Sequence, residues 1–116
     1  MDTYLTAENQ LFIKLPEIIL CFHPSDLLYI EANRSYSFIC IIGHETIKIC
    51  KPMCWLIEQI EKGLLIKCHK SFAVNRQNIQ IIDIENRIIK LKNEISVPIS
   101  FRELPKVIKL INNHSK

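Results

Sequence analysis

Residues 46–63 read TIKICKPMCWLIEQIEKG, and their hydrophobic pattern changes at Pro52. Before the proline, Ile47 and Ile49 alternate with polar residues, which is the two-residue period of a strand with one buried face. After it, apolar residues follow the i, i+3, i+4, i+7 spacing of a helix, at Met53, Leu56, Ile57 and Ile60. A proline at the start and Gly63 past the end are usual helix boundaries. The stretch predicts a strand near 45–49 and a helix over 52–62.

The rest of the chain predicts more strands and a second helix. Isoleucine is frequent, and β-branched residues favour strands. We expect strands near 11–15, 17–22, 26–32, 36–42, 64–68, 78–84, 87–92 and 94–99, with a tight turn at Asn93-Glu94. Pro98 cannot donate to a ladder and indicates an edge strand. A second helix is expected over 100–112, where Ser100 and Glu103 have capping-box spacing. The fold class is mainly β with two short helices.

The composition indicates one folded domain. The chain has 116 residues, of which 48% are hydrophobic and 23% charged, too apolar for a disordered chain. The longest stretch without a charge is the ten residues 35–44, short of the roughly 18 that a membrane helix needs. The first residues lack the basic start and apolar run of a secretion signal. We expect a cytoplasmic protein with no membrane partner.

The charge is unevenly distributed. Residues 1–63 carry five Lys/Arg against eight Asp/Glu, a net charge of −3, whereas residues 64–116 carry ten against four, a net charge of +6. A basic half favours a polyanion partner, although many ordinary domains share this feature.

The cysteines do not follow the pattern of a disulfide-bonded protein or of a zinc site. The odd number of cysteines, with no export signal, predicts reduced thiols at Cys21, Cys40, Cys50, Cys54 and Cys68. Cys50, Cys54 and nearby His44 offer thiolate and imidazole ligands, but structural zinc sites usually present a second ligand pair. We expect no metal site.

Catalytic groups are also missing from the pattern. Cys68 and His69 would point to opposite faces of a strand, so they are not a local nucleophile and base, and only a distant partner is left open. Asp83 and Glu85 fall in an expected turn before Asn86, where acids favour local hydrogen bonds. We expect neither enzyme activity nor a cofactor.

Polar and basic residues gather in three segments between the expected strands. These segments are 33–36, 67–78 and the start of the last helix at Arg102, and we interpret 72–78 as part of a connection. Arginine and lysine can bond guanine or hold phosphates, and asparagine can bond adenine. Together they favour a DNA groove over an apolar ligand.

The same segments resemble a known family in order and spacing. They read DLLYIEA at 26–32 with Tyr36 after it, HKSFAVN at 69–75 and VPISFR at 97–102. These motifs, with the 52–63 helix between the first and second, resemble the LytTR family of bacterial DNA-binding domains over about residues 11–111. We accordingly expect the DNA-binding unit at 11–113, between an N-terminal extension at 1–10 and a tail at 114–116.

The resemblance implies an elongated domain that binds repeated sites in promoter DNA through loops between strands, as the output of response regulators. It assigns base contacts to Tyr36, Asn75 and Arg102. Phosphate contacts or loop positions are assigned to Asn33, Arg34, His69, Lys70, Arg76, Asn78 and Lys106. For His69, a role at the DNA edge and a role in bonding the neighbouring backbone are equally compatible with the motif.

A second hypothesis is that the chain has a LytTR-like fold but binds another protein and not DNA. An edge strand at 97–99 could join the sheet of another protein, so the chain could modulate a full-length regulator by pairing with it. A dimer on DNA is a further possibility that the sequence leaves open.

Overall fold

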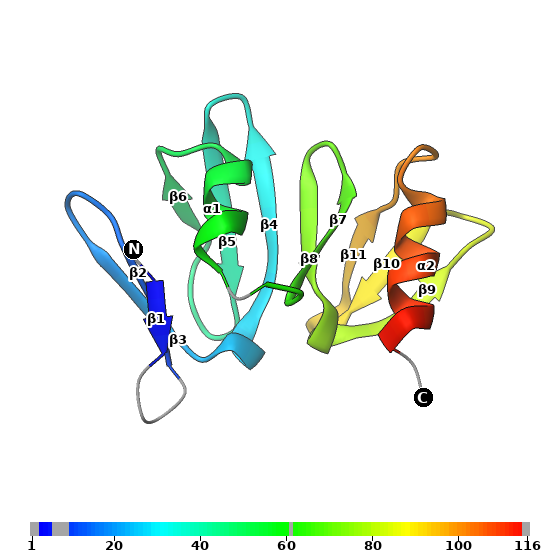
Figure 1. Cartoon of the computed structure of the whole chain (residues 1–116), viewed down its shortest axis with the longest axis horizontal. Helices are drawn as coiled ribbons and strands as arrows, with labels where there is room; N and C mark the ends of the chain where they lie inside the picture. The colour runs from blue at the N-terminus through cyan, green and yellow to red at the C-terminus, as the bar shows by residue number, and fades with distance from the viewer. Residues whose placement is uncertain (1–2, 6–9, 61, 115–116) are drawn as a thin grey trace.

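The computed structural model describes residues 3–5, 10–60 and 62–114, and its strands form three antiparallel sheets (Figure 1). The first sheet contains β1 (Thr3–Leu5), β2 (Leu11–Lys14) and β3 (Ile19–Phe22). The central sheet has the order β6-β5-β4-β8-β7, from β4 (Leu27–Asn33), β5 (Tyr36–Ile41), β6 (Ile47–Ile49), β7 (Leu65–His69) and β8 (Phe72–Asn75). The third has the order β11-β10-β9, from β9 (Ile79–Asp83), β10 (Ile88–Leu91) and β11 (Ile95–Pro98). The molecule measures 42 × 33 × 25 Å, which agrees with the elongated shape expected.

Two hydrophobic cores lie in the molecule, and the central sheet contributes to both. The first core is formed by the five strands from β2 through β6 together with helix α1 (Met53–Gln59). The second core is formed by β7, β8, the third sheet and helix α2 (Leu104–His114). Neighbouring residues of a strand point to opposite faces. Ala73 belongs to the first core and Val74 to the second, so β8 is buried on both faces.

This double burial corrects one sequence interpretation. Residues 72–75 were expected to belong to a connection, but they form β8, which pairs with β4 and β7. A strand buried on both faces lacks the alternation of apolar and polar residues by which a half-buried strand is recognised. The nine predicted strands are present with slightly different ends, and β1 is an additional one.

Both helices are present, each with a shifted start or end. Helix α1 begins after Pro52, ends at Gln59 and is followed by Gly63 at φ 89°. Helix α2 begins at Leu104 rather than Ser100, because Pro105 fits the first turn of a helix, where its missing N–H is not needed. The Ser100 side chain still accepts the Glu103 N–H at 3.1 Å, so the predicted cap lies just ahead of the helix.

The turn and edge predictions for the third sheet are confirmed. Asn93 and Glu94 have φ angles of 63° and 59° in the short connection from β10 to β11. The strand that contains Pro98 is the outer strand of its sheet. None of the helices among the described residues is long and apolar enough to cross a membrane.

Cys68 provides a test of the second core. The side chain is fully buried, and its Sγ lies 3.5 Å from the Pro98 carbonyl oxygen. Burial raises the pKa of this thiol to about 12. The unfolded chain would ionise it near pH 9, while the folded chain keeps it protonated, so its stabilising effect is present below pH 9 and is lost as the pH rises towards 12.

Urea denaturation at pH 8 and pH 10 measures this effect. Between these values the free energy of unfolding should fall by about 1 kcal/mol more in the wild type than in Cys68→Ala. Equal decreases in the two proteins would contradict a buried, protonated Cys68.

Candidate nucleic-acid interface

The turn between β4 and β5 presents polar side chains to solvent. Asn33, Arg34, Ser35 and Tyr36 are all exposed, and Arg34 has a φ of 61°. Lys48 from the neighbouring strand β6 lies with its Nζ 4.0 Å from the centre of the Tyr36 ring. A cation over an aromatic face is attracted by the ring quadrupole, so the ammonium group helps to orient Tyr36.

The turn between β7 and β8 presents Lys70 at its tip. Lys70 is exposed, whereas His69 is partly covered and contacts the Phe72 ring edge-on at 5.7 Å between centroids. The Nδ1 atom of His69 accepts the Ser71 backbone N–H at 3.0 Å. Neutral His69 therefore carries its proton on Nε2, which leaves a donor for a ligand. Both roles considered for this histidine are compatible with the geometry.

The third loop leads from β11 into α2 and contains Phe101 and Arg102. The backbone N–H of Glu103 donates hydrogen bonds to the hydroxyl and carbonyl oxygens of Ser100, which makes the loop compact. Arg102 is exposed, and the exposed fraction of Phe101 is 79%. The guanidinium of Arg87, from the turn between β9 and β10, lies 5.4 Å from the Phe101 ring centre. The sequence analysis did not select Phe101, because a phenylalanine after an apolar strand gives no sign that it lies outside the core.

Backbone hydrogen bonds bring the three loops together. The Ala32 N–H donates to the Ser71 carbonyl at 2.8 Å, and the Ser100 N–H donates to the Cys68 carbonyl at 2.9 Å. The turns from β4 to β5 and from β7 to β8, and the loop before α2, accordingly occupy one edge of the molecule, the upper edge in Figure 1. We call residues 33–36, 69–71 and 101–102 the loop rim.

The loop rim carries positive charge only. It contains Arg34, Lys70 and Arg102 and no aspartate or glutamate. Lys106 is close in sequence, in the first turn of α2, with its Nζ 3.9 Å from a Glu103 carboxylate oxygen. An exposed pair at this distance contributes little to stability, so the Lys106 ammonium stays accessible.

Asn75 lies elsewhere and is fully buried. Its Nδ2 donates to the carbonyls of Pro24 and Leu27 at 2.7 and 2.8 Å, and its Oδ1 accepts the Gln77 N–H at 2.9 Å. These partners are at the start of β4, the end opposite to its turn with β5. The expected base contact of Asn75 is therefore not supported by its position, because the amide holds the chain together at the far end of β8.

Two other predicted contacts share that end. Asn78 is buried, and its Nδ2 donates to the Ser25 and Leu27 carbonyls at 3.0 and 2.6 Å. Arg76 is half-buried, and its Nε donates to the Gly63 carbonyl at 3.1 Å. The structure thus separates the ten predicted residues, with Asn75, Arg76 and Asn78 away from the loop rim.

Metal-binding groups do not gather in the described part of the chain. Among residues 3–5, 10–60 and 62–114, no three His, Cys, Asp or Glu side chains are grouped as a metal site would require. The chemistry offered by the loop rim is therefore hydrogen bonding, positive charge and aromatic contact.

Comparisons with known proteins find a matching family model, relatives of similar sequence and a solved structure. The family model described as the LytTr DNA-binding domain matches residues 17–112. Accessory gene regulator protein A from Staphylococcus epidermidis and from Staphylococcus aureus is 29% identical over 83 residues, which cover 71% of this chain and 34% of the relative. This chain thus matches about a third of the length of those relatives.

A solved structure has the same fold. The LytTr DNA-binding domain of a response regulator from Bacillus cereus superposes with a TM-score of 0.73 at 21% identity, covering 89% of this chain and 96% of the other.

Asn75 yields a prediction that separates a structural role from DNA contact. Asn75→Ala should lower the free energy of unfolding by about 2 to 3 kcal/mol, because buried carbonyls lose their donor. Asn33→Ala, a matched change at an exposed position, should alter it by less than about 0.5 kcal/mol. Urea denaturation measures both, and a stable Asn75→Ala protein would contradict the structural role.

Proposed function

This chain belongs to the LytTR DNA-binding domain family, a non-catalytic family whose role is transcription regulation, and we propose that it binds specific sites in duplex DNA with its loop rim. The observation that carries the proposal is the joining of three exposed loops, with three cations and no carboxylate, at one edge of the molecule. Such a surface suits a polyanion with polar groove edges. Binding promoter DNA would take place in the cytoplasm.

Roles in the proposed complex follow from side-chain chemistry. Arg102 stands on a compact loop and has the planar donor pair that matches guanine O6 and N7, so we assign it a base contact. Tyr36 is assigned a second base contact. Lys70, Arg34 and Lys106 are assigned phosphates, which require charge but little geometric precision.

The neighbouring residues complete the assignment. Asn33 and His69 are assigned loop positions beside these contacts, with Nε2 of His69 as a further donor. Phe101 adds an apolar surface next to Arg102, of the kind that contacts thymine methyl groups.

The alternative of pairing through the strand at 97–99 has less support. The edge of β11 faces β7, since the Ser100 N–H donates to the Cys68 carbonyl and the Cys68 thiol to the Pro98 carbonyl. Another protein would need to displace these contacts in order to add a strand there.

Arg102 tests base recognition. Selection of bound duplexes from a random pool should enrich a motif, and Arg102→Ala should weaken binding to it by about 5- to 150-fold while relaxing one base position. Lys109→Ala, an exposed cation on α2 outside the loop rim, is the matched control and should bind within about twofold of the wild type. If no motif is enriched at low salt, the proposed function is wrong.

Lys70 and Arg76 test which edge faces DNA. Lys70→Ala should reduce the slope of log affinity against log salt concentration by about 0.9, the contribution of one phosphate contact. Arg76→Ala should leave the slope unchanged, because Arg76 lies at the other end of the sheet. Fluorescence anisotropy over a salt series measures both slopes, and a larger change for Arg76→Ala would contradict the assignment of the loop rim.

A further inference from the structure

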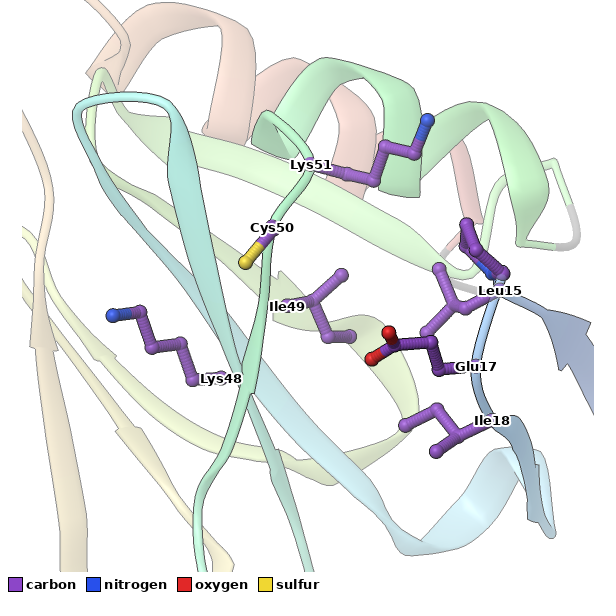
Figure 2. A pocket seen from close by; sticks show the side chains of 8 residues that line it. Leu15, Glu17, Ile18, Lys48, Ile49, Cys50 and Lys51 are labelled. Carbon is purple, nitrogen blue, oxygen red and sulfur yellow. The ribbon is translucent and has the colours of Figure 1, made fainter.

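A groove lies at one end of the molecule, between the turn that joins β2 to β3 and the edge strand β6. Its volume is about 360 Å³, at the lower end of the range for ligand sites. Leu15 and Ile18 from the turn and Ile49 from β6 point towards one another across it (Figure 2). Nearby Ile18 and Ile19 have exposed fractions of 48% and 59%, which is unusual for isoleucine and continues the apolar surface onto the outside.

The walls of this groove are mainly basic. Lys51 lines it on the β6 side, with its Nζ 5.1 Å from the centre of the Trp55 ring, Glu17 lines the opposite side, and Lys14 lines the adjoining hollow. The Lys48 backbone also borders the groove, but its ammonium group points away from it and lies over the Tyr36 ring (Figure 2). Lys14 and Lys51 against Glu17 give a formal charge of +1. Among the described residues, no carboxylate lies within 4.0 Å of any of these lysines. The occupant that fits is apolar at its centre and acidic at its sides.

The turn between β9 and β10, at the other end of the longest axis, has this chemistry (Figure 1). Ile84 stands in the turn with an exposed fraction of 54%, between Asp83 and Glu85. Asn86 donates to both carboxylate oxygens of Asp83, at 3.0 and 2.9 Å, which fixes the shape of the turn. Arg87 is directed to the Phe101 ring, so the exposed tip is acidic and apolar.

We propose that copies of this chain associate head to tail, with the β9–β10 turn of one copy seated in the groove between the β2–β3 turn and β6 of the next. Ile84 would cover Leu15, Ile18 and Ile49, and Glu85 would face Lys51. Both surfaces are present on every copy and lie at opposite ends, so one copy cannot use them on itself. The contact is heterologous and leaves a free groove at one end and a free turn at the other.

A contact made by one turn is small, and small interfaces are weak. It would act mainly where copies are already concentrated, for example when they occupy neighbouring sites on another molecule. The proposal does not depend on DNA binding, because neither surface includes a residue of the loop rim.

A charge exchange at the two ends tests the contact without DNA. Sedimentation velocity over a concentration series should detect association of the wild type, and Glu85→Lys or Lys51→Glu should each raise the dissociation constant by about fivefold or more. An equimolar mixture of these two variants should associate again, because every groove then meets a turn of opposite charge. A variant that carries both substitutions should associate with itself.

An apolar substitution provides the second measurement. Ile84→Ser should abolish association, whereas Leu110→Ser, at an exposed leucine on α2 that belongs to neither the groove nor the β9–β10 turn, should leave it unchanged. A wild type that stays monomeric up to millimolar concentration overturns the proposal, as does loss of association in both single variants without recovery in the mixture. Failure to bind DNA would leave these results unaffected.

Discussion

Two backbone hydrogen bonds fix the relation of the three loops on which the functional surface depends. One runs from the Ala32 N–H to the Ser71 carbonyl, and the other from the Ser100 N–H to the Cys68 carbonyl. Because they join backbone to backbone, they hold the loops in place without using the side chains. Arg34, Lys70 and Arg102 therefore stay directed to solvent, where a ligand can reach them. Strand β8, which ends one side of the β7–β8 turn, is itself fixed between the two cores, with Ala73 buried in one and Val74 in the other.

At the opposite end of the sheet, side-chain hydrogen bonds hold the chain segments together, whereas at the loop rim backbone hydrogen bonds do so. Asn75 and Asn78 both donate to the Leu27 carbonyl, and their other bonds reach Pro24, Ser25 and Gln77. A buried amide must find partners or destabilise the fold, so these two residues are committed to the scaffold. At one end of the molecule the polar side chains are therefore used in internal hydrogen bonds, whereas at the loop rim they remain accessible to a ligand.

Residues with a regular pattern were predictable, and residues whose role depends on distant contacts were not. The period of 3.6 around Leu56 and Val107, the alternation in 46–49 and the edge position of Pro98 follow from local chemistry. The strand at 72–75 was missed because its two buried faces remove the alternation. The buried position of Asn75 was not predictable, because an asparagine beside polar residues has the same appearance in sequence whether it bonds a base or the Leu27 carbonyl, and only the fold brings that carbonyl within 2.8 Å. The exposure of Phe101 depends likewise on Arg87, which is fourteen residues away in sequence.

The loop rim and the two complementary ends together constrain how copies would be arranged on DNA. The rim extends along the longest axis in Figure 1, and the groove and the β9–β10 turn lie at the two ends of that axis. A heterologous contact relates neighbours without reversing their order, whereas a symmetric dimer relates them by a two-fold axis. Copies in head-to-tail contact would therefore follow one another in the same direction along their longest axis. Direct repeats in DNA have that property and palindromes do not, so the ends of the molecule and its rim favour the same kind of operator.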